Sequence, residues 1–97
     1  SSMVMLVRDA LLEMKKVLDY TGDVAANYMK MEARCRKIYV FEERGDEFYR
    51  EEIRRLFTEK QSAAYMIYWK DILVDVERML DAAAGAATLL QKLFVRV

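Results

Sequence analysis

The chain has 97 residues, 55% of them hydrophobic, and its 16 basic and 16 acidic residues leave no net charge. This length allows one compact domain, 1–97, and the balanced charge gives no overall field that would attract nucleic acid. The sequence has no histidine, one cysteine and no uncharged run near the ~18 residues of a membrane span. We therefore expect a cytoplasmic, non-enzymatic protein without a transmembrane segment, with a place beside the inner membrane left open.

The first predicted helix spans about residues 3–19. Its apolar positions have the spacing of one amphipathic helix and are Val7, Leu11, Met14 and Leu18. Glu13 is expected on the opposite, solvent-facing side. The segment 20–23, Tyr-Thr-Gly-Asp, predicts a turn. The alternative that the helix runs on through Gly22 stays open, because one glycine costs a helix only about 1 kcal/mol.

The second predicted helix spans about residues 23–57. Its inward stripe advances in steps of three and four and contains Met31, Cys35, Ile38, Glu42, Gly45, Tyr49, Glu52 and Leu56. Cys35 is interpreted as a core residue, because no histidine is present to activate the thiol. A break follows at 58–61, and Ser62 is predicted to cap the next helix.

The third predicted helix spans about residues 63–95. Its main seam is predicted to contain Tyr65, Trp69, Ile72, Val76, Met79, Ala83, Ala86, Leu90 and Leu93. At 1.5 Å per residue the two later helices are each about 50 Å long and the first about 25 Å, so the first cannot cover the whole seam. We expect an all-α, antiparallel three-helix bundle that is completed by a homo-oligomer or a second repeat.

Two acidic pairs interrupt the apolar stripes of the later helices. Glu42 and Asp46 lie one turn apart on the second helix, and Glu77 and Asp81 lie one turn apart on the third. If these helices turn near residue 60, both glutamates lie at almost the same height, so the four carboxylates are expected to converge. Like charges at this spacing repel one another, and a bound cation would compensate them.

An all-oxygen site suits a divalent or trivalent cation such as Fe³⁺, Mn²⁺, Mg²⁺ or Ca²⁺. The alternative is that the two glutamates form ordinary ion pairs with Arg44, Arg78 or Lys70 at the edge of the bundle. Spacing alone favours this second interpretation, because helical E-x-x-x-D patterns are common. The predicted metal ligands are Glu42, Asp46, Glu77 and Asp81.

The segment from residue 38 onward resembles a known family. The residues that carry the resemblance are Phe41-Glu42-Glu43-Arg44-Gly45-Asp46, Tyr49-Arg50, Leu56-Phe57, Trp69-Lys70-Asp71-Ile72 and Val76-Glu77-Arg78-Met79-Leu80-Asp81. This pattern is similar to the PhoU-like family, in particular to the branch of Pit-associated phosphate-transport regulators. The resemblance implies three-helix, spectrin-like repeats, commonly two per chain, with metal bound by the E-x-x-x-D motifs. This chain would then be one repeat, the C-terminal half of a longer protein or a unit that dimerises.

Two functional hypotheses follow. The first is a non-enzymatic regulatory or accessory protein of phosphate uptake with a carboxylate metal site and a phosphate transporter or sensor as its partner. The second is a metal-free helical adaptor whose uncovered apolar seam binds another protein. A carboxylate di-metal enzyme is disfavoured, because such bundles normally add histidine ligands.

Overall fold

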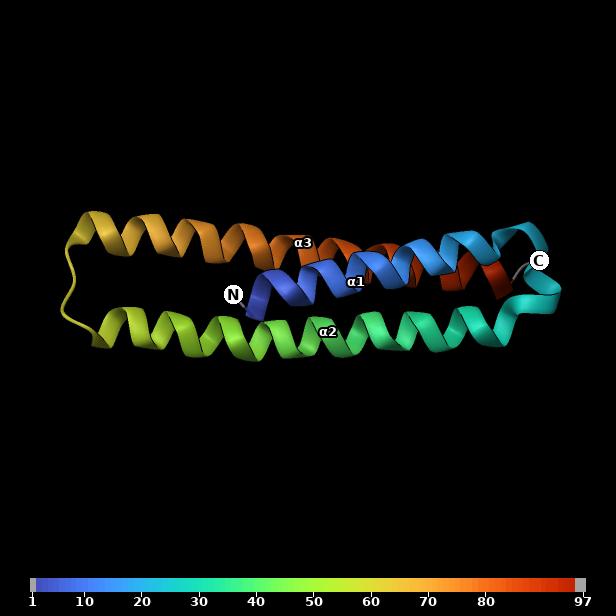
Figure 1. The fold of residues 1–97 in the computed structure, drawn as a ribbon, viewed down its shortest axis with the longest axis horizontal. Coiled ribbons are helices and arrows are strands. Elements are labelled where there is room, and N and C mark those ends of the chain that lie inside the picture. The colour runs from blue at the N-terminus through green and yellow to red at the C-terminus, as the bar shows by residue number, and fades with distance from the viewer. Residues whose placement is uncertain (1, 96–97) are drawn as a thin grey trace.

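The computed structural model describes residues 2–95 and is all-α. Helix α1 spans Ser2–Asp19, a 3-10 helix η1 spans Tyr20–Asp23, α2 spans Val24–Thr58 and α3 spans Ala63–Val95. The segments pack as an antiparallel three-helix bundle in which α1 and α3 run in the same direction and α2 runs against both (Figure 1). The predicted fold class is confirmed, and each helix boundary lies within one residue of its predicted position.

The first turn is closed by side chains of its own residues. The Thr21 hydroxyl donates a hydrogen bond to the carbonyl oxygen of Leu18 at 2.6 Å. Asp23 leaves the helical conformation, with φ −145° and ψ 84°, and its carboxylate accepts the backbone N–H of Ala26 at 3.1 Å. This capping satisfies an orphan donor at the start of α2. The alternative of one helix running unbroken through Gly22 is therefore wrong.

The second turn has a matching set of caps. The Glu59 N–H and the Thr58 hydroxyl both donate to the carbonyl oxygen of Arg55, at 2.9 and 3.1 Å, which closes the last turn of α2. The Ser62 hydroxyl oxygen accepts the backbone N–H of Tyr65 at 3.2 Å. Ser62 therefore caps the N-terminus of α3, as predicted from the sequence.

The core lies where all three helices overlap. Its central residues are fully buried and include Ala10 and Val17 of α1, Met31, Cys35 and Ile38 of α2, and Ala87 of α3. The inward stripe predicted for α2 is confirmed at these positions. Burial raises the pKa of the Cys35 thiol, with a further contribution from the nearby Glu32, so the thiol is an inert core group.

The faces predicted for α1 and α3 are right only in part. Val7 and Met14 of α1 pack against the core as predicted. Leu11 and Leu18 are more than half exposed, whereas Glu13 is buried. In α3 the buried positions are Leu80, Ala83, Ala87 and Phe94, while Met79, Ala86 and Leu93 of the predicted seam face solvent. Both helices carry apolar residues on more than one side, so their helical periodicity did not define a single inward face.

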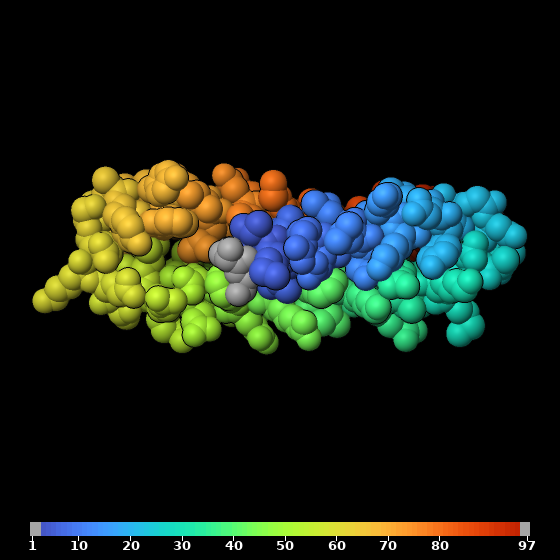
Figure 2. Space-filling view, in the orientation of Figure 1, coloured from blue at the N-terminus to red at the C-terminus, as the bar shows by residue number. Residues whose placement is uncertain are grey.

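Helix α1 covers only part of the bundle, as its length predicted. The molecule is 55 Å long and 16 × 15 Å in cross-section. Figure 2 shows α1 lying over one part of this length, while the end that carries the α2–α3 turn consists of α2 and α3 alone. None of the helices within residues 2–95 combines the length and apolarity that a membrane crossing requires.

Candidate metal centre

Helices α2 and α3 approach each other closely where the two acidic pairs lie. A Cβ atom at Gly45 would collide with Cδ1 of Leu80, so the missing side chain of Gly45 makes room for the leucine. Gly45 comes one residue before Asp46, and Leu80 one residue before Asp81. This contact sets the acidic side chains of both helices at one level of the bundle.

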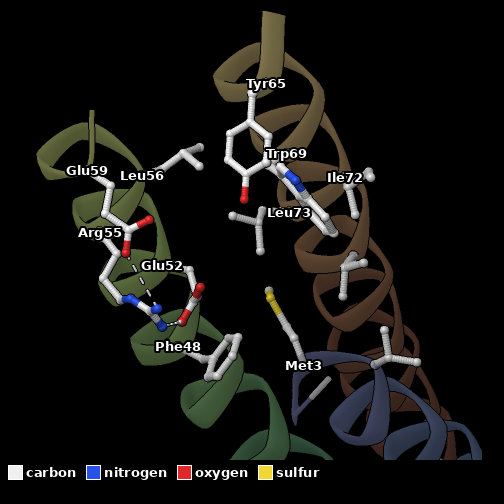
Figure 3. Close-up of a pocket in the computed structure, with 12 residues that line it drawn as sticks. Met3, Phe48, Glu52, Arg55, Leu56, Glu59, Tyr65, Trp69, Ile72 and Leu73 are labelled. Carbon is white, nitrogen blue, oxygen red and sulfur yellow. Dashed lines mark hydrogen bonds and ion pairs between the residues drawn. The ribbon is translucent and has the colours of Figure 1, made fainter. Parts of the chain in front are cut away.

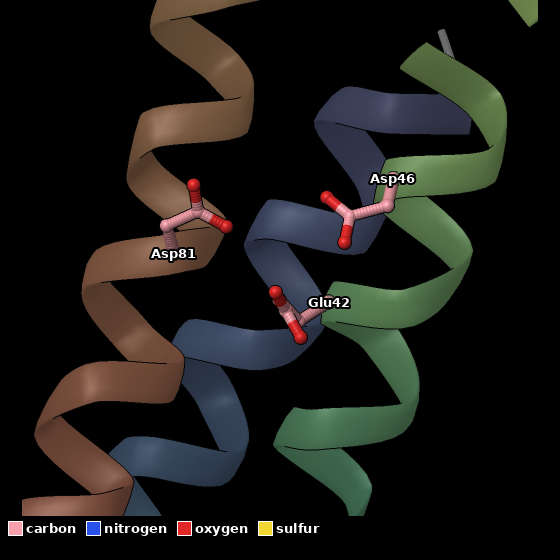
Figure 4. A group of neighbouring side chains, drawn as sticks. All are labelled: Glu42, Asp46 and Asp81. Carbon is pink, nitrogen blue, oxygen red and sulfur yellow. The ribbon is translucent and has the colours of Figure 1, made fainter. Parts of the chain in front are cut away.

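Three carboxylates form a tight group at this level. One oxygen from each of Glu42, Asp46 and Asp81 lies within 4.8 Å of the other two. Figure 4 shows the three side chains directed toward one another from the facing sides of α2 and α3. Two of the side chains are partly buried and Asp81 is exposed, so the group is open to solvent on one side.

The fourth predicted residue, Glu77, lies beside this group. Its side chain is partly buried, and both Asp46 and Asp81 raise its pKa, as they also raise that of Glu42. Each glutamate therefore interacts electrostatically with one aspartate of its own helix and one of the other helix. The predicted convergence of the acidic pairs is confirmed in geometry for Glu42, Asp46 and Asp81, whereas Glu77 lies outside this group.

Proton binding to the cluster is strengthened by its surroundings. Burial, hydrogen bonding to Asp46 and the charges of Asp46 and Asp81 raise the pKa of Glu77 from 4.5 to about 7, with Arg50 acting in the opposite direction. Burial, followed by the charges of Asp46 and Asp81, also raises the pKa of Glu42. A group of carboxylates that retains a proton near neutral pH lacks compensating positive charge.

The alternative ion pairs expected from the sequence are not formed among residues 2–95. Arg78 pairs with Asp75 at 3.8 Å, and neither Glu42 nor Glu77 lies within 4.0 Å of a lysine or arginine nitrogen in this part of the chain. Three or four carboxylate oxygens in one group, with an open side for water, are a donor set that hard cations accept. The group can therefore hold a cation.

A buried acidic residue elsewhere was missed by the sequence analysis. Glu13 of α1 is 7% exposed, and its carboxylate accepts from the Arg34 guanidinium at 3.2 Å and lies 3.5 Å from the Lys16 ammonium. This pair joins α1 to α2 across the edge of the core. No local pattern around Glu13 indicates its burial, because the partner arginine is 21 residues away.

The uncovered end of the bundle contains an apolar groove of about 450 Å³. Figure 3 shows it between α2 and α3, with Met3 of α1 at its inner end and Tyr65 and Trp69 at its outer end. Its rim carries Arg55, which pairs with Glu52 at 3.0 Å and with Glu59 at 3.6 Å.

The fold and the acidic group define a helical bundle with a carboxylate cluster between two antiparallel helices. Comparison of the chain with protein-family models, with curated proteins and with solved structures found no match. The resemblance of the motifs to the PhoU-like family therefore stays a prediction.

Proposed function

We propose that this protein is a non-enzymatic regulatory or accessory protein that binds a divalent or trivalent cation between α2 and α3. The observation that carries the proposal is the meeting of one oxygen from each of Glu42, Asp46 and Asp81 within 4.8 Å of one another. None of the three forms an ion pair within 4.0 Å among residues 2–95. Glu77 is the fourth candidate ligand, through its contact with Asp46. A cation there would replace a shared proton and join the two helices.

Oxygen-only ligands favour Mg²⁺, Ca²⁺, Mn²⁺ or Fe³⁺ over zinc, which prefers thiolate and imidazole. A structural or sensing role suits the site better than catalysis, because the sequence offers no histidine as a general base. The motif resemblance alone connects the site with phosphate uptake, and a phosphate transporter or its sensor would then be the partner.

Metal content and titration calorimetry test the proposal. We expect Mn²⁺, Mg²⁺, Ca²⁺ or Fe³⁺ to bind with one dominant site, and the Asp46→Asn, Asp81→Asn double variant to lose at least tenfold in affinity. A matched control replaces two exposed acids of the same helices, Glu51→Gln and Asp71→Asn, and should bind as the wild type does. Equal affinity of both double variants would refute the site.

A metal-free adaptor is the second candidate, and the groove at the uncovered end supports it. Trp69 and Tyr65 are each 41% exposed at that groove, and an amphipathic helix of a partner protein would bury them. Treatment with a strong chelator distinguishes the two proposed functions. If strong chelation leaves the melting temperature and the solution mass of freshly purified protein unchanged, the adaptor function is favoured.

A further inference from the structure

One side of the C-terminal half of α3 is apolar and faces solvent. Met79, Leu89 and Leu93 are 58%, 59% and 47% exposed, and Ala82 and Ala86 are exposed between them. From residue 79 to residue 93 these positions advance in alternating steps of three and four. This is the spacing with which one helix packs along another, so the side is suited to a helical partner.

Contacts with α2 show which flank of α3 this side occupies. Thr88 and Gln91 both hydrogen-bond to Tyr39 of α2, at 2.8 and 2.6 Å. At 100° per residue, Met79 and Ala86 lie on the other flank of the buried strip of α3. Because α1 is the other neighbour of α3, the exposed apolar side borders α1.

Helix α1 presents a similar flank. Its contact with α2 is marked by the Glu13–Arg34 pair, at 3.2 Å. Leu11 and Leu18, 56% and 52% exposed, project from the opposite flank, toward α3. We define the α1–α3 face by six residues, Leu11, Leu18, Met79, Ala86, Leu89 and Leu93.

The two helices of this face are parallel (Figure 1) and in register. Glu13 of α1 is level with Arg34 of α2, and Glu32 of α2 is level with Gln91 of α3, to which it is hydrogen-bonded at 3.3 Å. Counting along the helices from these two contacts places Leu11 within about 1.5 Å of the height of Ala86.

We propose that the α1–α3 face binds a second copy of this chain, antiparallel and related by a two-fold axis. The axis passes at the level of Leu11 and Ala86, so that each of these residues meets its own counterpart. Met79 and Leu93 lie seven residues on either side of Ala86, so each meets the other across the axis. The small Ala86 permits close approach at the centre, where two copies of a larger side chain would collide.

The area of the face agrees with this occupant. Five large side chains, each about half exposed, contribute on the order of 500 Å² of apolar surface per copy. Two copies would then bury about 1,000 Å² in all, the lower bound of a specific interface. The two-fold operation exchanges Met79 and Leu93, which lie at equal distances on either side of the axis, and leaves Leu11 and Ala86 on it. The proposal does not depend on the acidic cluster.

Placing a charged residue at position 11, on the proposed axis, tests this geometry. We expect sedimentation equilibrium to find a dimer of the wild type. The variants Leu11→Glu and Leu11→Lys should each raise the dissociation constant of the dimer at least 100-fold, because each places two like charges side by side. An equimolar mixture of the two variants should recover the dimer. Met29→Glu, at an 82% exposed position of α2, is the control and should dimerise like the wild type.

A cysteine at the axis gives an independent measurement. Ala86→Cys is expected to form an intermolecular disulfide under mild oxidation, because its counterpart is the same residue. Ala25→Cys, exposed on α2, is the control and should stay monomeric on a non-reducing gel. The native Cys35 is fully buried and does not compete.

Three results would overturn the proposal. They are a wild type that stays monomeric up to 0.5 mM, a dimer that neither Leu11 variant weakens, and a mixture of the two Leu11 variants that stays monomeric. A monomeric wild type that binds vesicles of phosphatidylcholine and phosphatidylglycerol, with loss of binding in Leu11→Glu, would assign the face to a lipid surface instead. Circular dichroism of each variant shows that the monomer remains folded.

Discussion

Leu80 of α3 packs onto Gly45 of α2 at the level of the acidic cluster, in space that a Cβ atom at residue 45 would occupy. Leu80 is 1% exposed, so its side chain has little freedom to move aside. The contact therefore sets the separation of the two helices where Asp46 and Asp81 meet, and it links the packing of the core to the geometry of the carboxylates.

Gly45→Ala should destabilise the protein by about 1–2 kcal/mol, because the cost of overpacking exceeds the gain in helix propensity. Gly85→Ala is the matched control, since a Cβ at Gly85 meets no atom within 4 Å. It should stabilise the protein by about 0.5–1 kcal/mol. Urea unfolding followed by circular dichroism measures both. Equal stabilisation by the two substitutions would show that Leu80 yields without cost.

The metal-free protein should lose stability as the pH rises from 5 to 8. The pKa of Glu77 is raised from 4.5 to about 7, so the folded state binds this proton more tightly than the unfolded state does. The stability contributed by Glu77 is then fully present below pH 4.5 and is lost as the pH rises through 7. The loss is at most about 3 kcal/mol, and about 1–2 kcal/mol after solvent screening.

Urea unfolding in the presence of EDTA at several pH values measures this loss. Other groups titrate in the same range, so the comparison is with Glu77→Gln, which should remove most of the slope between pH 5 and 7. The explanation fails if both proteins have the same pH dependence, or if the wild type becomes more stable toward pH 8.

Cation binding should stabilise the fold more at pH 8 than at pH 5.5. At the lower pH a proton occupies the Glu77–Asp46 pair, because the pKa of Glu77 is about 7, and it competes with the metal. At a metal concentration 100 times the Kd, the gain at pH 8 is about 2.7 kcal/mol. Thermal unfolding with and without Mn²⁺ at each pH measures it. A gain that persists in the Asp46→Asn, Asp81→Asn variant would place the cation elsewhere.

Breaking the Glu13–Arg34 pair, in which Glu13 is buried and Arg34 partly buried, should destabilise the protein more than replacing both residues. Arg34→Ala leaves the Glu13 carboxylate, 7% exposed, with only Lys16 nearby, and should destabilise the protein by about 2–4 kcal/mol. The double variant Glu13→Leu, Arg34→Leu should be about as stable as the wild type, because the desolvation cost of both charges disappears.

The control for this pair is Arg78→Ala, which removes an exposed ion pair with Asp75 and should change stability by less than about 0.5 kcal/mol. Denaturant midpoints for the four proteins complete the comparison. A double variant that is much less stable than Arg34→Ala would mean that the pair itself stabilises the fold.

Much of the fold was predictable from local chemistry. The caps at Asp23 and Ser62 are side-chain signals that act over three residues, and both are present. The meeting of the two acidic pairs followed from counting residues away from one turn, because an antiparallel helix pair preserves that count. Helix length alone predicted that α1 leaves one end of the bundle uncovered.

The rotation of α1 and α3 about their own axes was not predictable in this way. Leu11, Leu18 and Met79 have the same helical spacing as residues that are buried, and only neighbouring helices decide which set faces inward. The position of Glu13 has the same origin, since Arg34 reaches it from another helix.

By itself, the sequence determined the all-helical class, the helix ends and the level at which the carboxylates meet, because these depend on interactions within a few residues and on a fixed rise per residue. Only the tertiary structure decided which apolar stripe is buried, that Leu80 fills the space above Gly45, and that Asp81 rather than Glu77 completes the group of Glu42 and Asp46. These features depend on contacts between residues far apart in the chain, and such contacts form only when the helices pack against one another.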